Sequence, residues 1–488
     1  MIFTEVLIVG AGVIGTALAR ELSRYNVSVT VVERGSDIAE GATRANSGIV
    51  HAGYDAVPGT RKAAFNVRGA AMFPDLCRQL SVPYAQCGSI VVGFCNEDLL
   101  TLQRLLQRGI QNGVCGLRLL SREEALSMEP SLNPDICAAL DVPSGAVVSP
   151  YELAYAMADD AALNGVSFLF DLEVNSAFRT PDGLWQIGTA QDECFRCKTF
   201  VNCSGASGAV LHNLISDLPL HMTHRRGQYY LLDRASVLPF SRTVFQCPTP
   251  MGKGVLISPT VHGNLLIGPN AEDIRDPLDT ATTTEGLRFV LETARRTWPD
   301  LSVRTNITNF SGIRAHLDIN DFMIGPVSGA PGAFEAIGIE SPGLSSAPAI
   351  AQDLSETIAG FLALHRKERV IPPRIPEKAF ADMNDEERSE AVIRDPAYGN
   401  IVCRCEVVTE AEIRQAIRRP VGARSVDGVK RRTRAGMGRC QGGFCSPRAV
   451  QILSEETGIP LQKITKNGGK SFLLTGSVAS YLKGDDAE

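Results

Sequence analysis

The sequence lacks both a membrane-spanning segment and a secretory signal. The longest uncharged stretches, Thr199 to Ser216 and Gly254 to Ala271, are interrupted by polar residues and glycine, whereas a spanning helix needs about 20 apolar residues in succession. The chain runs from Met1 almost directly into the apolar stretch Val6 to Val9, without the charged, apolar and cleavage regions of a signal peptide. We therefore expect a cytoplasmic protein, at most peripheral on the inner membrane.

The sequence also lacks a strong overall charge and any internal repeat. Its net charge is -6 and its pI is near 5.8, so no global basicity predicts a nucleic acid partner. With 44% hydrophobic and 21% charged residues, the composition is that of an ordinary globular protein, and the length allows two or three domains.

The first 35 residues contain a complete strand, glycine turn, helix and second strand. Gly10, Gly12 and Gly15 follow the first strand in the pattern G-x-G-x-x-G, and Glu33 closes the second strand. Gly10 permits a tight turn, Gly12 lets a pyrophosphate approach the backbone, and Gly15 allows close helix packing. The helix N-terminus would supply amide donors, and Glu33 would accept hydrogen bonds from a ribose. The unit predicts a dinucleotide site, without deciding between FAD and NAD.

The residues that follow decide between these two cofactors. Residues 41–53 read GATRANSGIVHAG, and here the chain resembles the D-amino-acid-oxidase-like superfamily of FAD enzymes, in its L-2-hydroxyglutarate dehydrogenase and glycerol-3-phosphate dehydrogenase branch. Residues 226–228, 310–315 and 338–344 resemble further segments of that superfamily in the same order. The resemblance implies a flavin between two domains, roofed by an antiparallel sheet.

The resemblance also implies which residues contact FAD. They lie in the glycine turn, after the second strand, in the 41–53 segment and in two later loops. They are Gly10, Gly12, Val13, Ile14, Gly15, Glu33, Arg34, Thr43, Asn46, Ser47, Gly48, Gly205, Gly343 and Leu344.

Two residues are the candidates for catalysis. Arg314, in the segment FSGIRA, offers a planar fork for a substrate carboxylate or phosphate. His51 could accept a hydroxyl proton while hydride leaves the same carbon, because imidazole titrates near working pH; a structural role, or a covalent flavin link in this region, is the alternative. Lys62, Tyr54 and His316 are weaker candidates for binding substrate.

The order of patterns predicts the fold class and the domains. We expect an α/β, Rossmann-like FAD-binding domain in discontinuous parts, about 1–80, 145–215 and 330–365. The runs FVNCSGASG and FEAIGIESPG would be further strands of its parallel sheet. An α+β substrate domain with a mixed or antiparallel sheet would comprise about 81–144 and 216–329, so that residues 1–365 form the oxidoreductase.

The remaining C-terminal part divides into a linker, a module and an extension. Proline and charge dominate residues 366–398, which predicts a partly helical linker. Residues 399–456 read as a small helical module, followed by a C-terminal extension, 457–488.

Four of the 13 cysteines form a metal-binding pattern in that module. They form two close pairs, Cys403 with Cys405 and Cys440 with Cys445. Four thiolates arranged in this way can bind a soft metal centre. The segments IVCRCEVVTEAEI and TRAGMGRCQGGFC resemble the [2Fe-2S] module of bacterioferritin-associated ferredoxin, which implies an iron-sulfur cluster. Structural zinc is the rival interpretation, and a disulfide is disfavoured in the cytoplasm. The other nine cysteines are expected to be small buried residues.

One basic segment lies between these pairs. Residues 414–439 contain nine basic residues and one acid, Asp427, with no aromatic residue for base stacking. We expect this charge to balance the cluster or to dock an acidic electron-transfer partner, with solvated helix faces as the alternative.

Together the motifs predict an FAD-dependent dehydrogenase that oxidises a small anionic secondary alcohol, such as L-2-hydroxyglutarate or glycerol 3-phosphate. Electrons would pass from flavin to the [2Fe-2S] cluster and then to an acceptor protein or a quinone-linked partner, in a homo- or hetero-oligomer. Oxidation of an amino acid or opine is an alternative, as is a non-catalytic electron-transfer subunit. A nucleic-acid-binding redox or iron sensor ranks last.

Overall fold

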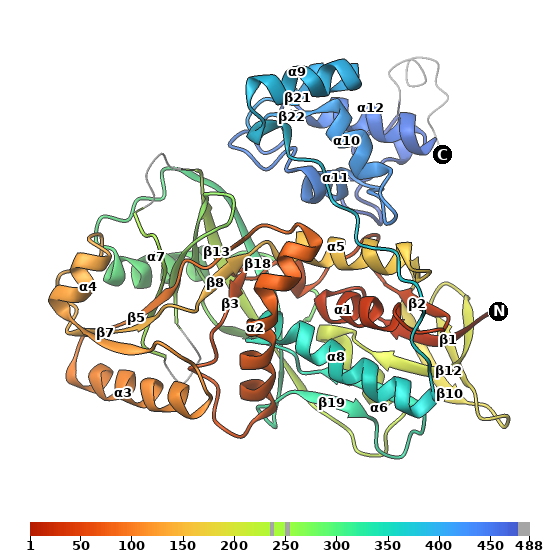
Figure 1. The fold of residues 1–488 in the computed structure, drawn as a ribbon, viewed down its shortest axis with the longest axis horizontal. Coiled ribbons are helices and arrows are strands. Elements are labelled where there is room, and N and C mark those ends of the chain that lie inside the picture. The colour runs from red at the N-terminus through yellow and green to blue at the C-terminus, as the bar shows by residue number, and fades with distance from the viewer. Residues whose placement is uncertain (235–238, 249–253, 477–488) are drawn as a thin grey trace.

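The computed structural model describes residues 1–234, 239–248 and 254–476. Two sheet-based parts lie side by side, and a small helical part sits on top of them (Figure 1). The last twelve residues of the expected C-terminal extension, 477–488, lie outside the described residues.

The first sheet is the parallel sheet that the glycine motif predicts. Its parallel strands run in the order β20, β12, β1, β2 and β9. The bounds are β1 Ile2–Val9, β2 Val29–Val32, β9 Ser167–Leu169, β12 Cys194–Asn202 and β20 Ala333–Ile337. Both later runs predicted as strands of this sheet, β12 and β20, are confirmed. β10 (Val174–Arg179), β11 (Trp185–Thr189) and β19 (Met323–Pro326) extend it with antiparallel pairings.

Helices cover this sheet and bury its apolar strands. α1 (Val13–Leu22) packs against α5 (Pro150–Leu163) and α8 (Gly343–Leu362), and α8 also packs against α2 (Arg61–Leu80). Two further helical segments are α6 (Gly208–Asn213) and the 3-10 turn Ala42–Arg44. The Rossmann-like fold class is confirmed.

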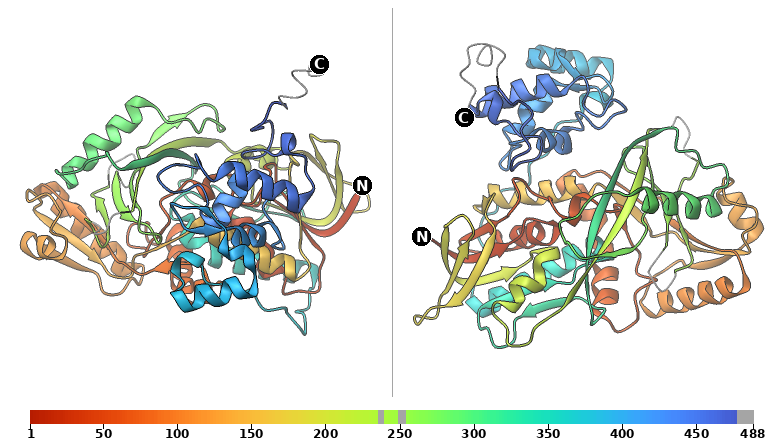
Figure 2. Two further views of the ribbon diagram at one scale, coloured as in Figure 1. Left: turned by 90° about the horizontal axis from the view of Figure 1, so that it is seen from above. Right: turned by 180° about the vertical axis from the view of Figure 1, so that it is seen from behind.

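The second sheet is mixed, and Figure 2 shows it curving away from the first. Its path is β17, β13, β16, β15, β14, β5, β7 and β6, with β18 also paired to β13. All pairings are antiparallel except that of β14 with β5. The bounds are β5 Ser89–Gly93, β6 Arg118–Ser121, β7 Ala138–Val142, β13 Met222–Leu232, β14 Thr243–Gln246, β15 Leu256–Pro259, β16 Leu265–Gly268, β17 Glu272–Ile274 and β18 Asn306–Leu317.

Three helices and a small sheet complete this part. α3 (Asn96–Gln111) and α4 (Arg122–Met128) pack near β5 to β7, and α7 (Thr284–Thr297) packs on β13 and β16. A three-stranded sheet of β3 (Ile49–Val50), β8 (Ala146–Val148) and β4 (Tyr84–Ala85) joins the two sheets.

The C-terminal module is built from α9 (Asp385–Arg394), α10 (Glu410–Ile417), α11 (Val426–Thr433), α12 (Ser446–Thr457) and the short hairpin β21 (Ile401–Cys403) with β22 (Val408–Thr409). Capping boxes start two of the helices, with Asn384 before α9 and Thr409 before α10. Phe380 and Tyr398 are buried in one apolar cluster with Ala411. The second half of the segment expected to be a linker therefore packs against the module.

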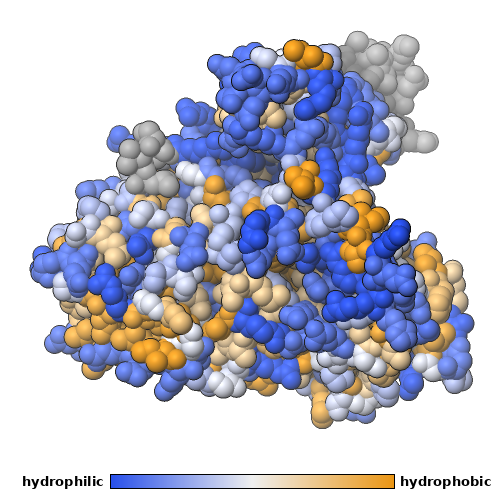
Figure 3. Space-filling model, viewed as in Figure 1, coloured by the Kyte–Doolittle hydropathy of each residue, from blue (hydrophilic) through white to orange (hydrophobic). Residues whose placement is uncertain are grey.

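The surface of this module is mostly hydrophilic in the space-filling view (Figure 3). Among the helices of residues 1–234, 239–248 and 254–476, none is long and apolar enough to cross a membrane.

Candidate active site

One large cavity runs between the two sheets and under the module. Its volume is about 2570 Å³, which exceeds the 300–1,000 Å³ typical of a small-ligand pocket. It is lined by the glycine turn after β1, by the ends of β2 and β12, by β13 and β18, and by residues of α11. An extended dinucleotide and a second small molecule can fit in it together.

The glycine turn has the geometry that its sequence predicts. Gly10 has a φ of +107°, and a Cβ there would lie 2.5 Å from the carbonyl oxygen of Cys203. A Cβ on Gly15 would lie 1.9 Å from the Gly10 carbonyl oxygen. Gly12 is the N-cap of α1, and no side chain in the described residues caps this helix. The first-turn amides of α1 are therefore available to an anion, which fits the pyrophosphate of FAD.

Glu33 and Thr43 frame this turn. The Glu33 carboxylate accepts hydrogen bonds from the amides of Ala11 and Gly35, both at 2.8 Å. Burial raises the pKa of Glu33 despite these two bonds. The Thr43 hydroxyl accepts a bond from the Val13 amide at 2.9 Å. Each side chain is thus held in place at the cavity wall.

The loop after Thr43 is fixed by its own side chains. Asn46 donates to the carbonyls of Ala42 and Thr43 and accepts from the Gly48 amide at 2.8 Å. Gly48 has a φ of +66°, and a Cβ there would lie 2.7 Å from the Val148 carbonyl oxygen. This loop cannot shift without breaking its contact with the strand beside it.

The other residues expected to contact FAD lie in the same cavity, apart from Gly15, which acts through packing. Arg34 donates to Ser207 at 3.2 Å, and Ser47 lies 3.3 Å from the Tyr229 hydroxyl. The rest of the residues expected to contact FAD also line the cavity: Val13, Ile14, Gly205, Gly343 and Leu344. The structure thus brings together segments that are up to about 330 residues apart, from Gly10 to Leu344.

His51 also lines the cavity, beside the start of α8. Its backbone amide donates to the Ser345 hydroxyl at 2.7 Å, and its Nε2 lies 3.4 Å from the Ser341 hydroxyl. The ring packs against Phe245 with a centroid distance of 5.9 Å. These contacts orient the imidazole at the cavity wall, where it can exchange a proton with a bound molecule.

Arg314 lies in β18, on the side of the cavity formed by the second sheet. Its Nη2 donates to the Asn270 carbonyl at 3.3 Å, and among the described residues no carboxylate forms an ion pair with it. A Cβ on the neighbouring Gly227 would lie 2.6 Å from that Nη2. Glycine at position 227 therefore makes room for the guanidinium, which keeps donors available to an anion.

Lys62 and His316 meet at one carboxylate, which sequence reasoning did not identify. Glu340 Oε1 lies 2.7 Å from Lys62 Nζ and 2.9 Å from His316 Nδ1. Burial would raise the pKa of Glu340, but the Lys62 charge and both hydrogen bonds outweigh it and lower the pKa. All three side chains line the cavity, so the charge of Lys62 is already compensated within the chain.

Tyr54 does not belong to this group. Its side chain is 4% exposed and packs in an apolar cluster with Leu102 and Leu105, and burial raises its pKa well above the ordinary value. Among the described residues that line the cavity, Tyr54 does not appear. The prediction of a substrate contact failed because the side chain that follows the glycine-bounded segment points into the core.

The four C-terminal cysteines form two pairs, each with one thiol from either motif. Cys405 and Cys440 have their sulfurs 3.5 Å apart, and a hydrogen bond from Cys445 lowers the pKa of Cys403 to about 6. Burial raises the pKa of Cys440, but the hydrogen bond from Cys405 and the backbone amides of the Gly442 region outweigh burial and lower this pKa. Two pairs of thiols fit a two-iron cluster, in which each iron takes two of them.

The other nine cysteines differ in burial, and two of them, Cys87 and Cys194, are half-buried. Cys77, Cys197, Cys203 and Cys247 are buried, as expected. Cys95, Cys115 and Cys137 are exposed, and for these three the expectation was wrong. Each of the exposed three lies in a connection between secondary structure elements, where a hydrophobicity pattern gives no signal of burial.

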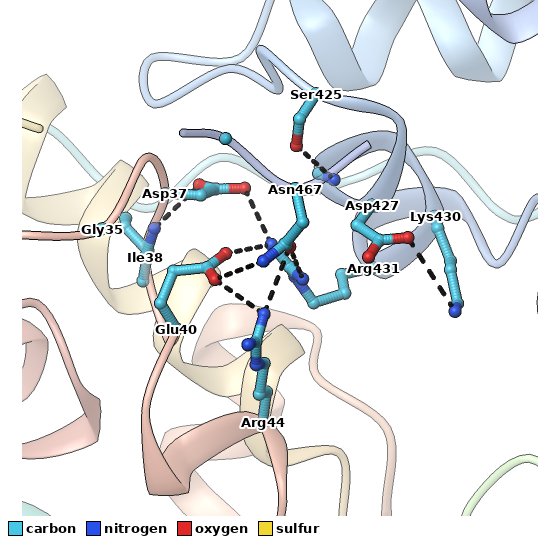
Figure 4. A network of polar contacts seen from close by, with 12 residues as sticks. Gly35, Asp37, Ile38, Glu40, Arg44, Ser425, Asp427, Lys430, Arg431 and Asn467 are labelled. Carbon is cyan, nitrogen blue, oxygen red and sulfur yellow. Dashed lines mark hydrogen bonds and ion pairs between the residues drawn. The ribbon is translucent and has the colours of Figure 1, made fainter. Parts of the chain in front are cut away.

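Most cations of the basic segment are engaged by the chain's own carboxylates. Arg432 donates two bonds to Asp37. Arg431 binds Glu40 at 2.5 Å (Figure 4). Arg419 binds Asp159 at 2.6 Å. The other ion pairs join Arg414 to Glu410, Glu455 and Glu456, Arg418 to Glu456, Arg434 to Glu406, and Arg439 to Asp233. Three of these cations, Arg419, Arg431 and Arg432, therefore fasten the module to the first domain, while Arg414, Arg418 and Arg434 pair within the module.

Comparison with known proteins agrees with both parts of the chain. Residues 5–357 match the family model "FAD dependent oxidoreductase", and residues 401–455 match "BFD-like [2Fe-2S] binding domain". The second match decides between iron-sulfur and zinc for the four cysteines.

Three relatives illustrate the range of similarity. A glycerol 3-phosphate dehydrogenase of Caloramator mitchellensis is 46% identical over 480 residues, covering 98% of this chain and 100% of the relative. The human mitochondrial L-2-hydroxyglutarate dehydrogenase is 32% identical over 282 residues, covering 55% of this chain and 60% of the relative. The structure of L-alpha-glycerophosphate oxidase from Mycoplasma pneumoniae with FAD bound has a TM-score of 0.73 and 31% identity, and it covers 78% of this chain and 100% of that one.

Proposed function

Because this chain belongs to the FAD-dependent oxidoreductase family and carries a BFD-like [2Fe-2S] binding domain, we propose that it is a dehydrogenase acting on glycerol 3-phosphate. The chain is an FAD-dependent oxidoreductase with homologues that oxidise hydroxyl compounds. The identity of the hydroxyl compound, the roles of individual residues and the external acceptor are the content of the proposal.

The state of Arg314 is the observation that carries the proposal. Lys62 in α2, Arg225 in β13 and Arg314 in β18 line the cavity. Lys62 forms an ion pair with Glu340, and Arg225 forms one with Asp273. Arg314 has no carboxylate partner among the described residues. A guanidinium without a carboxylate partner suits an anionic group of the substrate, such as a phosphate monoester.

The similarity to other proteins points the same way. The glycerol 3-phosphate dehydrogenase of Caloramator mitchellensis aligns with 98% of this chain, and so with the module as well as the FAD-binding part. The human L-2-hydroxyglutarate dehydrogenase aligns with 55%. L-2-hydroxyglutarate, with a carboxylate at each end, is the second candidate. It would use a second cation besides Arg314, and Arg108 lines the cavity without a carboxylate partner among the described residues.

The chain's own residues would act on the substrate as follows. Arg314 binds the phosphate and so holds the secondary alcohol carbon in the cavity. His51 removes the hydroxyl proton as the carbon gives up a hydride, which leaves the ketone. Lys62, Glu340 and His316 form the wall beside this carbon and supply a buried polar environment. FAD, held by the glycine turn after β1, would supply the hydride acceptor, and a cluster held by the four C-terminal cysteines would supply a one-electron relay to an external acceptor.

The test is anaerobic stopped-flow absorbance of the purified protein with its cluster intact. Glycerol 3-phosphate, L-2-hydroxyglutarate and a set of amino acids are mixed with it separately. Rapid bleaching of the flavin bands by glycerol 3-phosphate, followed by reduction of the cluster, is the expected result. Bleaching by L-2-hydroxyglutarate or an amino acid alone would overturn the proposed substrate.

A variant series tests the two assigned roles. His51→Gln should slow flavin reduction at saturating substrate by about 10²-fold or more, the scale of a lost general base. Asn213→Gln, a substitution at an exposed position outside the cavity, is the control. An unchanged rate in His51→Gln would remove that residue from the mechanism.

The remaining partners belong to the same proposal. The acceptor would be an electron-transfer protein or a quinone-linked partner, and the enzyme would work in the cytoplasm or peripherally on the inner membrane. Sedimentation of the protein with and without membranes, after cell breakage, measures the location directly.

A further inference from the structure

The C-terminal module forms part of the wall of the FAD cavity. Residues from the α11 region reach the same cavity as the glycine turn, although they are more than 400 positions away in sequence. They are Asp427, Lys430, Arg431, Arg434, Met437 and Gln441, and Lys466 and Asn467 join them from the segment after α12. The module therefore does more than carry the cluster.

Lys430 stands out among these residues because its charge is poorly compensated. Its ammonium lies 3.9 Å from Asp427 Oδ1, and within the described residues this ammonium donates no hydrogen bond. Asp427 is engaged instead by Lys466, whose Nζ lies 3.0 and 3.2 Å from its two oxygens. Figure 4 shows Lys430 beside Asp427, apart from the network that joins Arg431 to Glu40 and Arg44.

The neighbouring cations differ from Lys430 because each has strong partners. Arg431 donates to Glu40 at 2.5 Å, to the Tyr155 hydroxyl at 2.7 Å and to Asn467 at 3.0 Å. Burial lowers the pKa of Lys430, and the charges of Lys466, Arg431 and Arg44 lower it further against the opposing effect of Asp427. A bound anion would therefore stabilise the charged form of Lys430.

The pyrophosphate of FAD is the anion expected near the module, because the glycine turn would bind it at the N-terminus of α1. Arg44 follows Thr43, whose hydroxyl binds the Val13 amide at the start of α1. Arg44 Nη1 also donates to Asn467 of the C-terminal segment at 3.1 Å. The module thus contacts the first domain next to the helix N-terminus where a pyrophosphate would bind.

We propose that Lys430 of the module binds the pyrophosphate of FAD, so that the FAD site is completed by the module and the two associate cooperatively. FAD binding and docking of the module then strengthen each other by the same factor, because coupling between two equilibria is reciprocal. This inference depends on FAD binding and not on the substrate of the enzyme.

The test measures FAD affinity in the full-length protein after removal of the flavin, with the cluster retained. FAD is titrated into Lys430→Gln, and binding is followed by the change in flavin fluorescence. Lys470→Gln is the matched control, because Lys470 is exposed in the same C-terminal region and lies outside the cavity wall. The dissociation constant should rise about 10-fold in Lys430→Gln, the size of a lost hydrogen bond to a charged group, and stay unchanged in the control.

Two further measurements separate a phosphate contact from general damage. Lys430→Arg keeps a cation and should bind FAD within about three-fold of the wild type. ADP, which carries the pyrophosphate, should compete for the site about 10-fold less well in Lys430→Gln, again the scale of one charged hydrogen bond. The visible spectrum of the cluster and the melting temperature report whether the module is intact.

Equal FAD affinity in Lys430→Gln and Lys470→Gln would overturn the proposal. Equal weakening in Lys430→Arg and Lys430→Gln would also overturn it, since charge would then be irrelevant. No substrate is present in these titrations. A failure here is therefore distinct from a failure of glycerol 3-phosphate to reduce the flavin.

Discussion

Arg432 of the module donates two parallel hydrogen bonds to Asp37 of the first domain, Nη1 to Oδ2 at 2.6 Å and Nη2 to Oδ1 at 2.7 Å. Both side chains of the pair are buried, and the Arg432 guanidinium also lies over the Tyr155 ring, 3.9 Å from its centroid. A paired, bidentate contact of this kind fixes orientation as well as distance. It holds the cluster-bearing module in one position over the FAD cavity.

Replacing Asp37 should release the module. Asp37→Asn leaves Arg432 buried without its counter-charge, which typically costs 3–5 kcal/mol. Limited proteolysis of the extended segment 366–379 should accelerate, and the melting temperature should fall. Asp385→Asn is the control, because that side chain is fully exposed and its ion pair is long, at 3.7 Å; it should change stability by less than about 0.5 kcal/mol. Equal proteolysis in both variants would contradict this assignment.

The same ion pair should make docking of the module sensitive to acid. Burial would raise the pKa of Asp37, but the charges of Arg432 and Arg431 outweigh it, and the pKa lies below its ordinary value of 3.8. Its contribution to stability is therefore complete above that ordinary value and is lost as the pH falls through the lower, folded-state pKa. Proteolysis rates measured from pH 6 to pH 3 should rise at the acid end in the wild type, and this pH dependence should be weaker in Asp37→Asn.

Gly227 should matter for substrate binding because of the arginine beside it. Gly227→Ala would place a Cβ 2.6 Å from Arg314 Nη2 and 2.8 Å from Pro269 Cβ, so the guanidinium must move. We expect KM for glycerol 3-phosphate to rise about 10-fold, since 1.4 kcal/mol of lost binding is one factor of ten. Flavin reduction at saturating substrate should change much less. Gly360→Ala, at a helix position with open space around the Cβ, should leave KM unchanged.

Arg314 itself should set the preference for an anionic substrate. Arg314→Gln removes the charge that binds the phosphate, so kcat/KM for glycerol 3-phosphate should fall by about 10²-fold or more, the cost of a lost charged, bidentate contact. Activity with uncharged glycerol should change little, and the ratio of the two activities is the measurement. A proportional loss with both substrates would mean that Arg314 acts on the fold instead of the phosphate.

The local part of the active site could be predicted from the sequence. The roles of Gly10 and Gly15 follow from their spacing after a strand, because the tight turn and close helix packing are constraints that act within about ten residues. His51 and Arg314 were identified through the resemblance to known FAD enzymes, and the structure places both at the cavity. Their chemical roles stay predictions.

The rest depends on contacts between distant segments. Nothing in the sequence near Glu340 indicates that it meets Lys62, which is 278 residues away. In the sequence, Lys430 is one cation among several in a basic helix, and only the folded structure shows that it lines the cavity. Tyr54 shows the opposite error, since a residue adjacent to a motif can point into the core. The division into domains near residues 365 and 399 also stays a prediction.

The paired arrangement of the cysteines gives a test of the electron path. Cys405 and Cys440 form one pair, so Cys405→Ser with Cys440→Ser should remove two ligands of one iron and abolish the cluster absorbance. Substrate should still bleach the flavin, because the cavity around His51 and Arg314 is untouched, but reduction of a one-electron protein acceptor should fall sharply. Cys115→Ser, an exposed cysteine outside both pairs, is the control. If acceptor reduction persists at the wild-type rate without the cluster, the electrons leave directly from the flavin and the module serves only as a structural cover.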